Sequence, residues 1–282
     1  MTTSGIAVYG RPNDSGSADA SAIRRAGRET TGQVAAAAAS PDATAANIAA
    51  ATAAANAANG TNIANTANTA GTDLDGFPLD YVALDLETTG FYPNRCAITE
   101  IGAVRVRAGR IVDQFQELIN PLRPIPRQIT ALTGISDAMV ADLDPIDEVL
   151  PRFIAWLASS DSGSVPEPIV GHNVSFDLRF LDYNTRHVAG SGFACTDYDT
   201  MQISRTLFPE HKHHRLADLI VRFDIAQNEE HRALSDAIQT QECFEWMRRY
   251  IAGHHDPAQL EWRPVPAKSA TPILHQQLVV LR

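Results

Sequence analysis

Hydrophobic and polar residues follow a regular pattern only from Tyr81 onward. The apolar run 81–86 predicts a buried strand. Residues 98–106 and 111–118 carry alternating, β-branched side chains on either side of Ala108-Gly109-Arg110, which is typical of a hairpin. Three strands are therefore expected to open the folded domain.

After the hairpin, the pattern predicts strands that alternate with helices. Apolar residues recur at helical spacing from Ile146 to Leu157, directly after Pro145, which suits the start of a helix. Further elements are expected as strands at 169–170 and 194–198, and as helical segments at 174–188, 200–208, 216–223 and 233–250. This order predicts an α/β domain with a mixed sheet.

The residues before the first strand have a different composition. Residues 35–70 contain 19 alanines in 36 positions, and Asp42 is their sole charge. Ordering a backbone costs about 1 to 2 kcal/mol per residue, which so few large apolar side chains cannot offset. We therefore predict a disordered tail over 1–75, a folded domain over 76–252 and a proline-containing tail over 253–282. The other interpretations of the first segment are a transient alanine-rich helix and a mitochondrial-type presequence.

Composition narrows the class of protein. No apolar run approaches the roughly 18 to 20 residues of a membrane-spanning helix, and the N-terminus lacks the pattern of a secretion signal. Cys96, Cys195 and Cys243 are widely spaced, which argues against a disulfide framework and against a cysteine-based zinc site. We expect a cytoplasmic protein that does not associate with membranes.

The formal net charge of -10 argues against a protein that binds nucleic acid through a broad basic surface. It does not exclude nucleic acid as a substrate. An enzyme can recruit phosphates through metal ions held by carboxylates, because the ions then supply the positive charge.

Two acids stand at the end of the first predicted strand. Asp85 and Glu87 share one face of it, because strand side chains alternate. Neighbouring carboxylates repel each other unless a cation lies between them, and magnesium prefers such oxygen ligands. The alternative is a strand that has reached solvent, with Thr88-Thr89-Gly90 as its turn.

Further acids follow in two later segments. Asp177 ends Gly171-His172-Asn173-Val174-Ser175-Phe176-Asp177, early in a predicted helix, where the helix dipole alone favours an acid. His231 and Asp236 are five positions apart, which places their side chains about 140 degrees apart around a regular helix, so they cannot share one face of it. We place His231 in the loop that enters the helix and Asp236 one turn inside. Taken alone, such a pair is usually structural.

In this order, the three segments resemble the motifs of the DEDDh family of 3′-to-5′ exonucleases, and most closely those of the epsilon subunit of bacterial DNA polymerase III. The resemblance covers about residues 81–250. It includes Thr88-Thr89-Gly90, Glu100-Ile101-Gly102-Ala103-Val104, Asn120-Pro121 and the loop Ile129 to Ile135. It implies a ribonuclease-H-like fold, with a mixed five-stranded sheet flanked by helices.

The resemblance also implies two divalent ions, Mg2+ or Mn2+. In the family, the acids that match Asp85, Glu87 and Asp236 bind one ion, and those that match Asp85 and Asp177 hold the second. Two ions about 3.5 to 4 Å apart can activate a water and stabilise the leaving 3′ oxygen. His231 would be the general base, because an imidazole can take a proton near neutral pH.

Contacts with the substrate are carried over from the family position by position. Thr88, Thr89 and Phe91 match positions that touch the terminal nucleotide, and Ile135 would line the same pocket. Most relatives have leucine or methionine where this chain has Phe91, which could stack on a base with about 1 to 3 kcal/mol. Asn173 would orient the site. We interpret the neighbouring His172 as a loop histidine with satisfied hydrogen bonds.

The expected function is removal of nucleoside monophosphates from single-stranded 3′ ends of DNA, as in polymerase proofreading. The alternatives are a 3′-to-5′ exoribonuclease of the same family and a scaffold subunit that docks onto a DNA polymerase. Residues 277–281 faintly resemble the peptide by which polymerase-associated proteins bind the sliding clamp. A docking strand or a frayed tail is the other interpretation of this segment. The basic run 211–215 is interpreted as a solvated loop.

Overall fold

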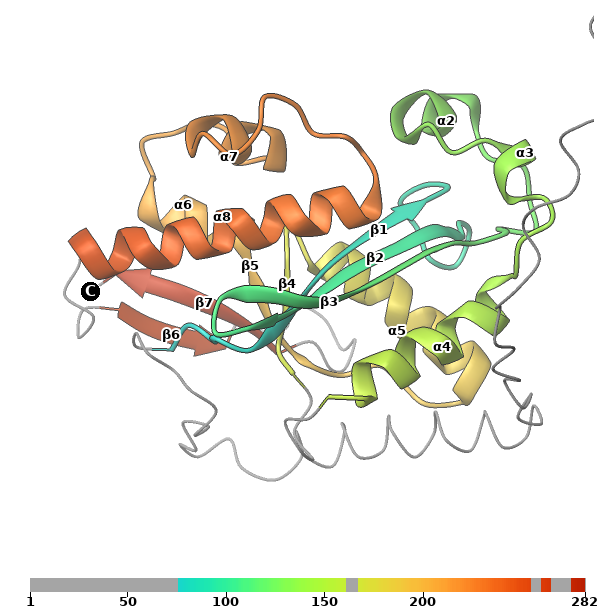
Figure 1. Ribbon diagram of the computed structural model, residues 1–282, viewed down its shortest axis with the longest axis horizontal. Helices are drawn as coiled ribbons and strands as arrows, with labels where there is room; N and C mark the ends of the chain where they lie inside the picture. Colours follow the sequence, from blue (N-terminus) through green and yellow to red (C-terminus); the bar gives the residue numbers. More distant parts are fainter. Residues whose placement is uncertain (1–75, 161–166, 255–259, 265–274, 282) are drawn as a thin grey trace, which may run out of the picture. The chain divides into compact units, whose positions relative to one another are not determined.

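The computed structural model describes residues 76–160, 167–254, 260–264 and 275–281. The tail predicted over 1–75 lies outside the described residues. The described elements, drawn in Figure 1, are β1 (Tyr81–Thr88), β2 (Ile98–Arg107), β3 (Arg110–Leu118), α2 (Arg127–Thr133), α3 (Asp137–Val140), α4 (Ile146–Ala158), β4 (Ile169–Gly171), α5 (Ser175–Ala189), β5 (Thr196–Asp199), α6 (Thr200–Leu207), α7 (Leu216–Arg222), α8 (Ala233–His254), β6 (Leu260–Pro264) and β7 (His275–Leu281).

The strands form one mixed sheet in the order β3-β2-β1-β4-β5-β7-β6. β1 pairs antiparallel with β2 and parallel with β4, so it lies where the antiparallel and parallel parts of the sheet meet. All five expected strands are present as β1 to β5. Within the segment 253–282, predicted as a proline-containing tail, residues 260–264 and 275–281 are described as strands β6 and β7. β7 pairs in parallel with the edge of β5 and antiparallel with β6.

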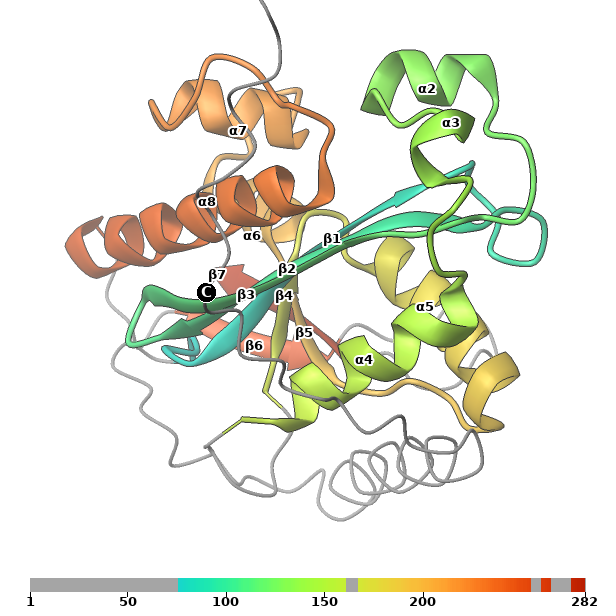
Figure 2. The same ribbon diagram turned by 45° about the vertical axis from the view of Figure 1, so that its right-hand side comes forward.

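Helices cover both faces of the sheet. α6, α7 and α8 lie on one face, and α4 and α5 lie on the other (Figures 1 and 2). Alternate residues of β1 enter the two cores: Tyr81 and Ala83 pack with the first group of helices, and Val82 and Leu84 with the second. Burial of both faces explains why this strand is a continuous apolar run. No helix in the described ranges is long and apolar enough to cross a membrane.

The loop expected over 129–135 was a wrong prediction for most of its length, because α2 occupies Arg127–Thr133. This helix has seven residues, several of them β-branched, so it is too short to show a clear helical period. It ends at Gly134, whose φ of 73° is the left-handed conformation common after a helix. That glycine was the available signal for a helix end.

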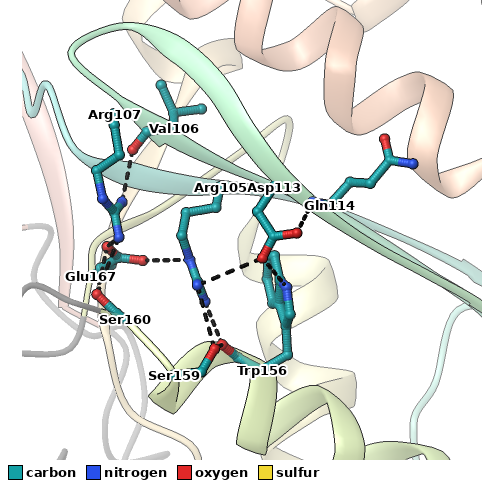
Figure 3. Close-up of polar contacts among 9 residues, drawn as sticks. All are labelled: Arg105, Val106, Arg107, Asp113, Gln114, Trp156, Ser159, Ser160 and Glu167. Carbon is teal, nitrogen blue, oxygen red and sulfur yellow. Dashed lines mark hydrogen bonds and ion pairs between the residues drawn. The ribbon is translucent and has the colours of Figure 1, made fainter. Parts of the chain in front are cut away.

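A charged network joins the sheet to α4 near the start of β1 (Figure 3). The Arg105 guanidinium lies 4.4 Å from the centroid of the Trp156 ring, and its Nε lies 3.3 Å from Glu167 Oε2. Trp156 Nε1 donates a hydrogen bond of 2.7 Å to Asp113 Oδ2 on β3. These contacts tie β2, β3 and α4 to the segment before β4, and so support the end of the sheet opposite the acids of β1.

Candidate active site

The end of β1 carries two acids toward α8. Asp85 and Glu87 follow Tyr81 and Ala83 on the same strand face, the one that α8 covers. α8 lies directly on β2 at this point, since a Cβ added to Gly102 would be 2.1 Å from the carbonyl carbon of Ala233. Glycine therefore permits the close approach that brings the first turn of α8 to the strand acids. Asp85 and Glu87 share one strand face, as the sequence predicted.

Asp236 completes a three-acid cluster. Carboxylate oxygens of Asp85, Glu87 and Asp236 lie within 4.8 Å of one another. Asp236 is 3% exposed, and its Oδ1 has no hydrogen-bond partner among the described residues. A buried carboxylate oxygen without a donor is costly, and a cation would satisfy it. A donor set made of oxygens alone fits a hard divalent ion such as Mg2+ or Mn2+.

Asp177 lies beside the same strand. It is 2% exposed in the first turn of α5, and its Oδ1 accepts a hydrogen bond of 3.2 Å from the backbone N–H of Leu86. Leu86 stands between Asp85 and Glu87, so this bond holds Asp177 next to the two strand acids. Because α5 follows β4, which runs parallel to β1, the helix begins at the edge of the sheet where β1 ends.

The cluster is electrostatically unfavourable without a cation. Burial raises the pKa of Asp85 well above its ordinary value, and Asp177, Asp236 and Glu87 raise it further. Burial and Asp236 raise the pKa of Glu87 to about 8. Burial and Glu229 raise the pKa of Asp236 to about 7. Mutually repelling acids at one place are typical of a functional site, where bound cations can compensate their charges.

His231 lies in the loop that enters α8, as predicted. Its φ of 52° is in the left-handed region, which few residues other than glycine adopt. Its Nδ1 is 3.5 Å from Glu229 Oε1. Ligand atoms of Glu229, His231 and Asp236 also lie within 4.8 Å of one another. The structure therefore places the imidazole next to an acid of the cluster, and adds Glu229, which the sequence did not single out.

A buried ion pair anchors the start of α8 to the sheet. Glu100 on β2 is fully buried and accepts hydrogen bonds of 2.8 and 3.0 Å from the Arg232 guanidinium and of 3.1 Å from the Ala233 N–H. Burial raises the pKa of Glu100, but hydrogen bonds from Arg232, Gln116 and Ala233 outweigh it, and the net pKa is lowered. Glu100 therefore stays charged and holds the helix that carries Asp236.

The threonines after β1 organise their own loop. The Thr88 hydroxyl donates to the Gly90 carbonyl at 2.7 Å, and the Thr89 Oγ1 accepts from the Ala97 N–H at 2.9 Å. Phe91, next in the chain, is 75% exposed. The loop thus presents an aromatic ring to solvent, while the two hydroxyls are already engaged.

Two residues predicted to contact or orient the substrate have defined structural surroundings. Ile135 is fully buried against Ile125 and Val140, so its side chain supports the α2–α3 segment, and its contact with a nucleotide stays a prediction.

Asn173 has an exposed side chain and a φ of 58°, and its N–H donates to Asp199 at 2.9 Å. His172 Nδ1 lies 3.0 Å from the Thr200 hydroxyl, but its buried Nε2 has no hydrogen-bond partner among the described residues, so its hydrogen bonds are not all satisfied as predicted. Burial lowers the pKa of His172 to about 4, which suits a neutral ring.

Residues 82–244 match the family model described as Exonuclease, of the RNase T type. The chain belongs to this exonuclease family. Among its relatives, the epsilon subunit of DNA polymerase III from Aquifex aeolicus is 35% identical over 171 residues, which are 61% of this chain and 80% of the relative. The PolC-type DNA polymerase III of Bacillus cereus is 35% identical over 160 residues, which are 57% of this chain. The chain spans only 11% of the length of that polymerase.

Solved nuclease structures share the exonuclease fold at low sequence identity. E. coli exonuclease I in complex with a dA16 oligonucleotide has a TM-score of 0.50 and 16% identity, over 62% of this chain and 43% of that one. Cell-death related nuclease 4 has a TM-score of 0.50 and 16% identity, over 61% of this chain and 64% of that one. These likenesses and the family match confirm the ribonuclease-H-like fold of β1 to β5.

Proposed function

We propose that residues 76–252 form a metal-dependent exonuclease domain that removes nucleoside monophosphates one at a time from 3′ ends of DNA. The observation that carries the proposal is the cluster of Asp85, Glu87 and Asp236 with His231 beside it. In this proposal, Asp85, Glu87 and Asp236 hold one divalent ion, and Asp85 and Asp177 hold a second.

The chain's own groups have separate tasks in hydrolysis of the terminal phosphodiester. Bound divalent ions would supply positive charge at the phosphate and make the attacking water more acidic. His231 accepts a proton from that water as its oxygen bonds to the phosphorus, and the bond from phosphorus to the 3′ oxygen of the preceding nucleotide breaks. The terminal nucleotide leaves with its phosphate, and the departing 3′ oxygen takes a proton from solvent to become the new 3′ hydroxyl of the shortened strand. Phe91 stacks on the terminal base, since its ring is exposed on the loop that follows Glu87.

The relatives support DNA as the substrate and a DNA polymerase as the partner. The Aquifex aeolicus relative is named as a subunit of DNA polymerase III, and the E. coli exonuclease I structure holds a DNA oligonucleotide. A proofreading role would require the domain to work with a DNA polymerase, and a sliding clamp is a further candidate partner. RNA differs from DNA at each nucleotide by its 2′-OH. Preferential cleavage of RNA would therefore favour the alternative function, a 3′-to-5′ exoribonuclease.

The test is digestion of oligonucleotides of one sequence as single-stranded DNA, matched duplex, mismatched duplex and RNA. With Mg2+, a 5′ label should give a ladder of shortened strands, and EDTA should abolish it.

Asp85→Ala should remove activity, and His231→Ala should lower kcat about 100- to 10,000-fold. Glu148→Gln, an exposed acid of α4 on the other face of the sheet, is the matched control. Full activity in both Asp85→Ala and His231→Ala would exclude the proposed site.

A further inference from the structure

Glu229 lies in the loop between α7 and α8 and makes two different contacts. Its Oε2 accepts a hydrogen bond of 3.1 Å from the N–H of Ala217, in the first turn of α7. Its Oε1 lies 3.5 Å from His231 Nδ1. One oxygen is therefore held by the backbone of a helix, and the other is directed at the imidazole.

The backbone and the ring of His231 are restrained by different groups. The backbone enters α8 through Arg232 and Ala233, both hydrogen-bonded to Glu100. The His231 side chain is 37% exposed, so packing alone restrains its ring weakly. Within the described ranges, Glu229 is the acid whose carboxylate lies within 4 Å of this ring's nitrogens.

A neutral imidazole carries its proton on one nitrogen and accepts a hydrogen bond at the other. A carboxylate at Nδ1 favours the form with the proton on Nδ1, and it fixes the orientation of the ring. We propose that Glu229 is a positioning residue that holds the proton of His231 at Nδ1 and leaves Nε2 to accept the proton of the attacking water. This inference rests on the function proposed above for His231.

The contact distance is consistent with this role. At 3.5 Å, Nδ1 and Oε1 lie close to each other without forming a direct hydrogen bond. Contacts of this kind are often long in substrate-free enzymes and shorten when the substrate is bound. The Ala217 N–H keeps the carboxylate in place for that movement.

The same contacts make Glu229→Gln a sharp test. A glutamine must turn its amide oxygen toward the Ala217 N–H, because an amide nitrogen cannot accept that bond. Its NH2 group then faces His231 Nδ1 as a donor, which drives the imidazole proton to Nε2. The variant keeps the size of the side chain and should fold, yet it holds the imidazole in the form that cannot accept a proton at Nε2.

We expect Glu229→Gln to lower kcat about 10- to 100-fold at a Mg2+ concentration that saturates the wild type, with little change in KM. Glu230→Gln, an exposed neighbour with the same loss of charge, should stay within twofold of wild type. In a His231→Ala background, Glu229→Gln should have no further effect, because it acts through the imidazole. An equal loss in both backgrounds would overturn the proposal.

Two further measurements separate positioning from other roles. In the metal-free protein at alkaline pH, nitrogen NMR of His231 should show the proton on Nδ1 in wild type and on Nε2 in Glu229→Gln. Glu229 also lies within ligand distance of Asp236. If higher Mg2+ restored the variant to wild-type kcat, Glu229 would be a metal ligand and the positioning role would be wrong.

The outcomes also distinguish this inference from the function on which it rests. Loss of activity in His231→Ala with wild-type kcat in Glu229→Gln overturns the role of Glu229 alone. Full activity in His231→Ala overturns the general base, and the role of Glu229 with it.

Discussion

Asp197 is a buried acid that lies outside the proposed active site. It is 1% exposed on β5, and neither of its carboxylate oxygens has a hydrogen-bond partner among the described residues. Burial and Asp199 raise its pKa to about 7. The acids around Asp236 can be compensated by a shared cation, whereas Asp197 belongs to neither group of potential metal ligands found in the described ranges. Its ionisation should therefore destabilise the fold.

This difference predicts a dependence of stability on pH. In the unfolded chain an aspartate titrates near 3.9, so the unfolded state loses its proton first and the contribution of Asp197 to stability falls between about pH 4 and 7. Asp197→Asn should therefore gain stability relative to wild type by up to about 1.4 kcal/mol for each pH unit in this window. Urea unfolding near pH 4.5 and 7.5 measures the gain, with the exposed Asp142→Asn as control. A gain that is equal at both pH values would contradict the prediction.

The acids and the histidine of the site differ in how far the sequence predicted them. Asp85 and Glu87 were expected to share a face because strand alternation is a local property, and the structure shows this. Glu229 was not expected to matter. Its partners are Ala217, at the start of another helix, and the His231 ring, whose direction depends on a left-handed backbone that local spacing does not reveal.

Helix α8 carries Asp236 and begins at Ala233, two residues after His231, so its position on β2 controls the site. Glu100 and Gly102 of β2 set this position, the first by hydrogen bonds to Arg232 and Ala233 and the second by lacking a side chain. The segment 100–104 was part of the family resemblance. Two of its residues, Glu100 and Gly102, share a strand face and contact the first turn of α8, and Val104 on the same face belongs to the core.

Gly102→Ala should displace this helix. The new Cβ would lie 2.1 Å from backbone atoms of Ala233 and Leu234, so α8 must shift. We expect about 1 to 3 kcal/mol of lost stability from overpacking. A 1 Å displacement of catalytic groups can also cost about 100-fold in kcat. Thermal unfolding and steady-state kinetics measure both effects.

Gly253→Ala in the same helix is the matched control. A Cβ at this position would have no neighbouring atom within 4 Å among the described residues, so the substitution meets open space. It should leave kcat unchanged and keep or raise stability, by up to about 1 kcal/mol from helix propensity. A Gly102→Ala protein that matched this control in both measurements would show that the close approach of α8 is not required.

The complete sheet is wider than the five strands of the expected domain. β7 lies between β5 and β6, so residues 277–281, which faintly resemble a clamp-binding peptide, are paired along β7 with neighbouring strands. Binding of this segment to a sliding clamp would therefore require β7 to leave the sheet. The clamp remains a predicted partner, and the alternative interpretation of the segment as a docking strand agrees with the pairing.

Ending the chain after His254 should expose the edge of β5. The backbone groups of residues 196–198 would lose their partners on β7, and unpaired strand edges promote association. We expect a lower melting temperature and concentration-dependent oligomers, with kcat of the folded monomer little changed because Asp85 and Asp236 lie on β1 and α8. Light scattering after size exclusion, together with thermal unfolding, checks this. A truncated chain that melts with the full chain and stays monomeric would refute it.

The sequence by itself determined the order of β1 to β5 and of α4 to α8, the shared face of Asp85 and Glu87, and the resemblance to an exonuclease family, because periodicity and motif spacing are local properties of a chain. It did not reveal α2, α3, β6 or β7. The tertiary structure decided which distant groups meet. Glu100 binds Arg232 across 132 positions, Asp177 accepts a bond from Leu86, and β7 joins β5. Such contacts depend on strand register and on helix packing, which arise only when the whole chain is folded.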